Sequence, residues 1–215
     1  LSNYTPESCI KMQLRCPVNQ LEDAAPEMSG AAFANKFHQA VQIAQNDVSR
    51  AVTHNKGIMN GSDAVILATG NDFRASGASV HAHAARNGQY RSLTSAKITN
   101  GEFIYELNMA LSLGTVGGLT QLHPLAKRSL EILNNPDART LMKVVAAAGM
   151  ANNFGAVRSL ITTGIQQGHM KLHLDNMINA LGADAKESQA IKNHFAGKTV
   201  SFADVKSYLN ELRKQ

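Results

Sequence analysis

Apolar residues that recur at helical spacing between Ser29 and Val52 constrain the fold of this chain more than any other pattern. Intervals of three and four residues place such side chains on one face of an α-helix. The residues are Phe33, Phe37, Ala40, Val41, Ala44, Val48, Ala51 and Val52. One long helix with a buried face is therefore predicted here, in a globular chain.

Two shorter helices are predicted after the long one. Asn60, Ser62 or both can cap a short helix that runs through Ala68. Asp72 is placed to begin the next helix, because a carboxylate at that position accepts hydrogen bonds from the first backbone N–H groups. These boundaries put Lys56 and Asp72 at loop or helix edges, where functional groups can be presented.

Strands are predicted in two regions. Residues 10–14 alternate between apolar and polar side chains, the period of a half-buried strand. Residues 90–97 and 103–109 bracket Asn100-Gly101, and both of these residues tolerate positive φ, which favours a hairpin turn.

The remainder is predicted to be helical. Pro124 opens a helix to Leu133, Asp137 begins helical segments that run to about Ile165, and three shorter helices follow Gly168. Ser201 and Asp204 are spaced as a capping pair for the last of them. The predicted fold class is therefore α/β of the α+β kind, with a hairpin-containing sheet among the helices.

Composition limits where the protein is expected to reside and which kinds of partner it is expected to bind. Of 215 residues, 44% are hydrophobic, which is enough to bury a core, yet no apolar run approaches the roughly 20 residues that cross a bilayer. No signal peptide is evident at Leu1, so a cytoplasmic protein without a membrane partner is expected. The two cysteines, Cys9 and Cys16, match neither a zinc knuckle nor a disulfide framework.

The formal net charge of +5 permits an anionic partner. Nucleic acid and the phosphates of CoA or a dinucleotide both qualify. With 5% aromatic residues and no tryptophan, stacking of single-stranded bases is poorly supported.

Lys56 and Asp72 lie in a Gly/Asn-rich segment and form a candidate proton-handling pair. A lysine near a carboxylate keeps its proton and can donate hydrogen bonds to charge that develops on a carbonyl oxygen. From spacing alone, an ordinary loop lysine and a helix-starting aspartate are the favoured explanation of the pattern.

Four ordered motifs carry a family resemblance. They are His-Asn-Lys-Gly-Ile-Met-Asn-Gly (54–61), Ala-Thr-Gly-Asn-Asp-Phe-Arg-Ala (68–75), Gly-Thr-Val-Gly-Gly (114–118) and Gly-Ile-Gln-Gln-Gly-His-Met-Lys-Leu-His (164–173). Together they resemble 3-hydroxy-3-methylglutaryl-coenzyme A (HMG-CoA) reductase of the second, mainly bacterial and archaeal, class. The resemblance covers nearly the whole chain but only the carboxy-terminal part of the family's length.

The resemblance implies roles for individual residues. Lys56 would polarise the thioester carbonyl and then the aldehyde carbonyl, and Asp72 would set the charge state of the lysine. Asn60 would orient the lysine and touch substrate. His169 would protonate the CoA thiolate, a role that suits imidazole because it titrates near neutral pH. A surface histidine, or half of a zinc site with His173, are the alternatives, but no third ligand is evident and no metal is expected.

Two further substrate contacts follow from the same resemblance. Arg50 matches an arginine that grips the glutaryl carboxylate, and guanidinium suits a planar carboxylate; a solvated helix-end arginine is the alternative. Asn153 resembles another substrate contact, with a buried capping asparagine as the alternative. The Gly114–Gly118 segment is not a dinucleotide fingerprint, and Leu119 stands where the family prefers a small residue.

The implied domains are the end of a small cofactor-binding domain with the return to the large domain (1–28), the large substrate-binding and catalytic domain (29–165), and a carboxy-terminal helical flap (166–215). The implied reaction interconverts HMG-CoA with mevalonate and CoA, using NADH or NADPH, in a homodimer or larger assembly. The family's catalytic glutamate and dinucleotide motif have no counterpart here, so the chain is expected to be a fragment that is inactive in isolation.

Two other function classes stay open at this point. One is a non-catalytic module that binds acyl-CoA or serves assembly. The other is a basic nucleic-acid-binding domain, whose affinity would fall steeply with salt.

Overall fold

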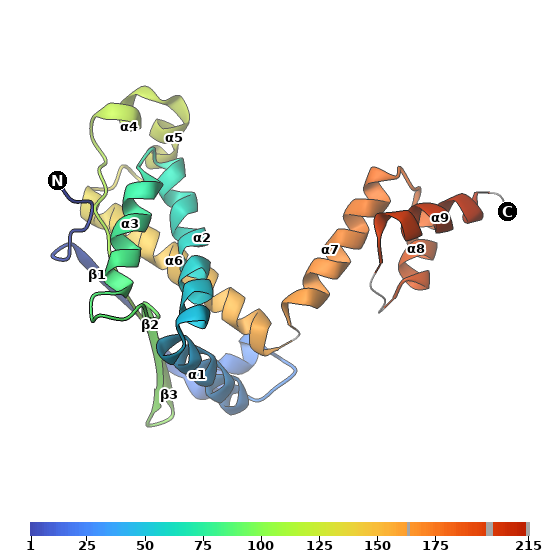
Figure 1. The fold of residues 1–215 in the computed structure, drawn as a ribbon, viewed down its shortest axis with the longest axis horizontal. Helices are drawn as coiled ribbons and strands as arrows, with labels where there is room; N and C mark the ends of the chain where they lie inside the picture. Colours follow the sequence, from blue (N-terminus) through green and yellow to red (C-terminus); the bar gives the residue numbers. More distant parts are fainter. Residues whose placement is uncertain (163, 197–199, 214–215) are drawn as a thin grey trace. The chain divides into compact units, whose positions relative to one another are not determined.

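The computed structural model describes residues 1–162, 164–196 and 200–213, without the side chains of Gln121 and residues 165–172. The chain divides into two compact units, Leu1–Thr162 and Thr163–Gln215. Figure 1 shows the elements of each unit. The elements are β1 (Cys9–Pro17), a 3₁₀ helix η1 (Val18–Ala24), α1 (Gly30–Asn46), α2 (Val48–Ala68), α3 (Phe73–Ala84), β2 (Thr94–Thr99), β3 (Glu102–Ala110), α4 (Gly118–Leu122), α5 (Pro124–Ile132), α6 (Ala138–Ile161), α7 (Ile165–Ala180), α8 (Ala185–His194) and α9 (Phe202–Leu212).

The first unit contains a three-stranded antiparallel sheet in the order β1-β3-β2. Both predicted strand regions contain strands, although β2 begins at Thr94 and not at residue 90. The β2–β3 hairpin turns at Asn100 and Gly101, which have φ values of 52° and 75°. β1 pairs with β3 from Cys9 opposite Ala110 to Pro17 opposite Glu102. The helix-rich α+β fold with a small antiparallel sheet is thus confirmed.

The core of this unit lies where α1 packs on the sheet and α2 packs along α6. Phe37 of α1 makes edge-to-face contacts with Phe103 and Tyr105 of β3, at ring-centroid distances of 5.3 and 5.1 Å. Such aromatic pairs add to the free energy gained from burial. α1 therefore packs against both the sheet and α2.

The predicted single long helix to Val52 is wrong, because the helix is interrupted at Asp47. Asp47 is extended, with φ −106° and ψ 122°, and its side chain accepts a hydrogen bond from the Arg50 backbone N–H at 2.6 Å. An aspartate that caps a new helix in this way separates α1 from α2. The apolar period continued across the break because residues of both helices enter the core.

The predicted short helix capped by Asn60 or Ser62 is also wrong, since α2 is continuous from Val48 to Ala68. Glycine normally weakens a helix interior. Here a Cβ on Gly61 would lie 2.4 Å from the Ala148 carbonyl oxygen of α6, so glycine is required for the close approach of the two helices. Lys56 consequently lies within a helix and not at a loop edge.

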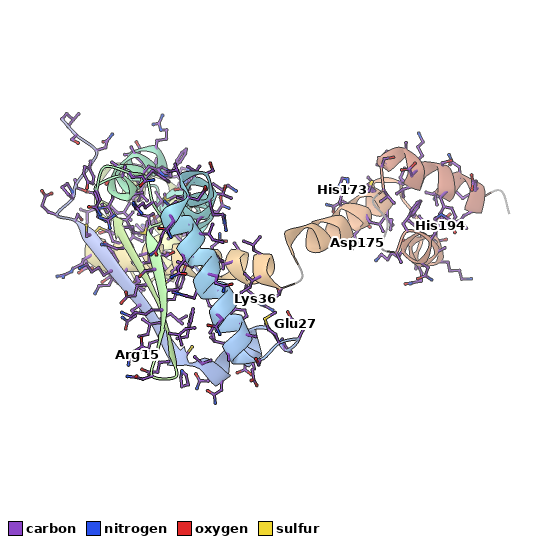
Figure 2. All side chains as sticks on the ribbon, turned by 60° about the horizontal axis from the view of Figure 1, so that its bottom comes forward. Arg15, Glu27, Lys36, His173, Asp175 and His194 are labelled. Atoms are coloured by element: carbon purple, nitrogen blue, oxygen red, sulfur yellow. The ribbon has the colours of Figure 1, made fainter. Side chains whose placement is uncertain are left out.

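The second unit is a three-helix module made of α7, α8 and α9. Its small core contains Met177, Ile178, Ile191, Val205 and Leu209. The predicted capping pair is confirmed at the start of α9, where Ser201 and Asp204 cap each other's backbone N–H groups. Figure 2 shows His173 and Asp175 on α7 and His194 at the end of α8.

Candidate active site

Lys56 lies on an exposed strip of α2. Val48, Val52, Lys56 and Asn60 follow one another at intervals of four residues, and all four side chains are exposed. Val52 is 52% exposed. The strip therefore presents one amine and one amide on an otherwise apolar helix face.

The turn that carries Lys56 is fixed by buried polar residues on the opposite side of α2. His54 Nε2 lies 2.6 Å from Thr94 Oγ1. Asn55 accepts from the Leu93 N–H at 3.0 Å and donates to the Arg91 carbonyl at 2.8 Å. These bonds tie the helix to the segment that leads into β2.

Burial governs the charge of His54. Its side chain is 1% exposed, and its pKa falls to about 4, first because burial penalises the imidazolium and second because Arg50 is nearby. His54 is therefore neutral at physiological pH, and its Nδ1 has no hydrogen-bond partner within the described residues.

Two asparagines of α6 reach the same turn of α2. Asn153 donates to the His54 carbonyl at 2.9 Å and accepts from the Tyr105 hydroxyl at 2.5 Å. Asn152 donates to the Gly57 carbonyl at 2.6 Å. The predicted site residue Asn153 is 1% exposed and lies inside α6, so its described amide bonds are internal and it caps no helix.

Asp72 is the N-cap of α3, as predicted. Its carboxylate accepts from the backbone N–H groups of Arg74 at 2.9 Å and Ala75 at 3.1 Å, and it lies 3.5 Å from the Arg74 guanidinium. The Ala75 N–H makes the largest contribution to a pKa below the usual range for this carboxyl. The side chain is 54% exposed, so a charged carboxylate is presented to solvent.

The Gly114–Gly118 segment packs beside the Asp72 turn. Asn71 donates to the Gly114 carbonyl at 3.0 Å and accepts from the Gly114 N–H at 2.8 Å. The next helix turn brings Leu119 against Gly70. In Figure 1, α4 and α5 lie at the end of the unit where α2 finishes and α3 begins.

The same segment does not fit a dinucleotide. A pyrophosphate site of that kind needs a parallel strand followed by a helix whose N-terminus faces the phosphates. Here the segment joins β3 of an antiparallel sheet to α4, which has five residues. The Gly114–Gly118 segment therefore lacks the strand–helix geometry of a Rossmann-type dinucleotide site.

Lys56 and Asp72 do not meet within one chain. Twelve helical residues separate Lys56 from Ala68, which is about 18 Å along the helix axis, and Asp72 lies beyond that end. Among the described side chains, no carboxylate lies within ion-pair distance of Lys56. Within a single copy of the chain, the two residues of the predicted proton-handling pair are therefore far apart.

The other predicted residues are distributed as follows. Arg50 is half-buried in the first turn of α2, on a different side of the helix from Lys56. Asn60 shares the exposed strip with Lys56 one turn later. His169 belongs to α7, but its side chain lies outside the described residues.

Sequence reasoning missed His54, Asn55 and Asn152 as parts of this arrangement. The available signal was the presence of polar residues on the core side of an amphipathic helix, since buried polar groups need partners.

Over the described ranges, no cluster of three or more His, Cys, Asp or Glu side chains is suited to a metal ion. The helices in those ranges also lack the combined length and apolarity needed to cross a bilayer.

Several known proteins are similar to this chain. Residues 1–174 match the family model described as hydroxymethylglutaryl-coenzyme A reductase. A 3-hydroxy-3-methylglutaryl-coenzyme A reductase of Archaeoglobus fulgidus is 46% identical over 149 residues, covering 69% of this chain and 34% of that protein. A probable enzyme of the same name from Borreliella burgdorferi is 38% identical, covering 69% and 35%.

Solved structures give the same result. A class II 3-hydroxy-3-methylglutaryl-CoA reductase from Streptococcus pneumoniae, bound to NADPH in open conformations, matches with a TM-score of 0.71 at 37% identity and covers 99% of this chain and 51% of that one. The chain thus spans about a third of the length of the curated relatives and about half of the solved chain. The resemblance drawn from the four motifs is confirmed, and the chain belongs to the hydroxymethylglutaryl-coenzyme A reductase family.

Proposed function

We propose that the complete polypeptide containing this chain interconverts HMG-CoA with mevalonate and CoA, and that Lys56 is the group that polarises the reacting carbonyl. The observation that carries the proposal is an amine on an exposed helix face, with no carboxylate at ion-pair distance in the described part of the chain. Hydrogen bonds of His54, Asn55, Asn152 and Asn153 anchor the helix turn that carries this amine. A fixed cation can stabilise the oxygen that becomes negative during reduction.

The strip around Lys56 suits a thioester substrate. The Lys56 amine donates hydrogen bonds to the carbonyl oxygen of the thioester, and then to that of the aldehyde. Asn60, one turn away on the same face, orients the amine and contacts substrate. Arg50 binds the glutaryl carboxylate through its planar guanidinium.

Asp72 reaches Lys56 from a second copy of the chain. The distance along α2 excludes direct pairing within one copy. Apolar side chains accompany both groups, with Val52 52% exposed near Lys56 and Phe73 41% exposed beside Asp72. Burial of such side chains between subunits would stabilise a homodimer, or a larger assembly, that brings the amine and the carboxylate together.

The remaining assignments come from the family pattern. His169 protonates the departing CoA thiolate as a carboxy-terminal flap of residues 166–215 closes and excludes water. Residues 29–165 form the large substrate-binding and catalytic domain. Residues 1–28 form the end of the small cofactor-binding domain and the return of the chain to the large domain. Asn153 stays a predicted substrate contact, although its described bonds hold the Lys56 turn.

The reductant is NADH or NADPH. The solved Streptococcus pneumoniae reductase is bound to NADPH. Because the Gly114–Gly118 segment lacks the geometry of a Rossmann-type dinucleotide site, we assign it no cofactor contact. Neither nucleic acid nor a membrane enters the proposal as a partner.

Substitution of Lys56 in the full-length enzyme tests the proposal. Lys56→Ala should abolish mevalonate formation and leave the unfolding temperature unchanged. Lys36→Ala, which removes another exposed lysine of the same unit, is the control and should leave turnover unchanged. Normal turnover by the Lys56 variant would refute the assignment.

A non-catalytic acyl-CoA-binding module is the second candidate, since the glycine-rich Gly114–Gly118 segment lacks the geometry of a Rossmann-type dinucleotide site. It predicts saturable binding of HMG-CoA without NAD(P)H oxidation, even when the amino-terminal part of the protein is present.

A further inference from the structure

The helix turn that carries Lys56 receives hydrogen bonds from outside the helix on both sides of the lysine. Asn153 donates to the His54 carbonyl and Asn152 donates to the Gly57 carbonyl. A carbonyl inside a helix already accepts the N–H four residues later, but its oxygen has a second lone pair. α6 thus adds bonds to a turn that an isolated helix would hold less firmly.

Close crossing of α2 and α6 makes these bonds possible. A Cβ on Gly61 would lie 2.8 Å from Asn152 Cβ, and a Cβ on Gly149 would lie 3.0 Å from the Ile58 carbonyl oxygen. Only helices that approach backbone to backbone let a short asparagine side chain of one reach a main-chain carbonyl of the other.

Asn152 and Asn153 differ in what else they support. Asn153 is buried and also accepts from the buried Tyr105 hydroxyl, so its loss would leave core polar groups without partners. Asn152 is exposed, and its one side-chain hydrogen bond among the described residues goes to Gly57. Core stability does not require that bond.

We propose that Asn152 is a positioning residue for Lys56, because it fixes the carbonyl next to the lysine and so limits the positions open to the amine. The inference rests on the proposed role of Lys56 in polarising the substrate carbonyl. Asn152 acts through the helix turn and does not touch substrate. A small displacement of a catalytic group lowers the rate of reaction much more than it lowers substrate affinity when binding depends on other side chains.

Asn152→Ala in the full-length enzyme tests this role. Loss of one hydrogen bond to a positioned group should lower kcat for mevalonate formation about tenfold, with KM for HMG-CoA within about twofold of the original value. Hydrogen–deuterium exchange should become faster for the amides of residues 57–61.

Ser62→Ala is the matched control. Ser62 donates to the Val145 carbonyl at 3.3 Å, so it also links α2 to α6 through a carbonyl, but it does not contact the Lys56 turn. The control should leave kcat and the exchange of residues 57–61 unchanged, even where it lowers the unfolding temperature.

Two results would overturn the inference: a kcat of Asn152→Ala equal to that of the control, whether both are normal or both are lowered, or an effect confined to KM. These outcomes differ from failure of the proposed function. Normal turnover by Lys56→Ala refutes the proposed function, whereas an inactive Lys56→Ala enzyme with normal Asn152→Ala turnover refutes only the positioning role.

Discussion

Replacement of Gly61 by alanine should destabilise the first unit, although alanine is the better helix former. The new Cβ would lie 2.4 Å from the Ala148 carbonyl oxygen, a main-chain atom that cannot rotate away. Overpacking of this kind costs about 3 kcal/mol at its usual upper range, and the gain in helix propensity is about 1 kcal/mol. The net loss is therefore about 2 kcal/mol, which lowers the unfolding temperature of a domain of this size by about 4–8 °C.

Calorimetry and urea titration followed by far-ultraviolet circular dichroism measure the change. Gly155→Ala on α6 is the matched control, since a Cβ there meets no atom within 4 Å. It should raise stability by up to about 1 kcal/mol. If both substitutions raise stability, α2 and α6 do not cross as closely as described, and the account of how the Lys56 turn is held is wrong.

Two further predictions concern the site. Because the pKa of His54 is about 4 in the folded chain and near 6.5 in the unfolded chain, the unfolded state binds more protons between these values and stability is lost as pH falls from about 6.5 toward 4. The loss amounts to up to about 3 kcal/mol, and urea midpoints of His54→Gln should lack this part of the pH dependence; an unchanged dependence would show that His54 does not titrate in this way. Asp72→Ala and Asp137→Ala each remove a helix N-cap and should each cost about 1 kcal/mol in thermal unfolding, but only Asp72→Ala should abolish turnover of the full-length enzyme. Equal turnover in these two variants would remove Asp72 from the proposed site.

Local sequence signals predicted the elements whose structure depends on neighbouring residues. Asn100-Gly101 specifies a hairpin because both residues accept positive φ. Asp72 and the Ser201–Asp204 pair specify helix starts through bonds to N–H groups two or three residues away. These interactions need no distant partner, so the chain order alone suffices to find them.

The environment of Lys56 depends on distant residues and was therefore mispredicted. Gly57 and Gly61 suggest a break when α2 is considered alone, but α6 supplies the packing that keeps the helix continuous. The partners Thr94 and Asn152 lie about 40 and 95 positions away in the sequence. The distance between Lys56 and Asp72 also could not be predicted, because a separation of sixteen residues in sequence is compatible with a compact loop or with an extended helix.

Lys56 and Asp72 are proposed to act together only across two copies of the chain, and complementation between inactive variants tests this pairing most directly. Full-length Lys56→Ala and Asp72→Ala enzymes, each inactive alone, are mixed, dissociated and reassembled. A mixed dimer then contains one site with both native side chains, so about a quarter of the original turnover should return. No recovery, in a mixture shown by native mass spectrometry of tagged chains to contain mixed dimers, would contradict the account.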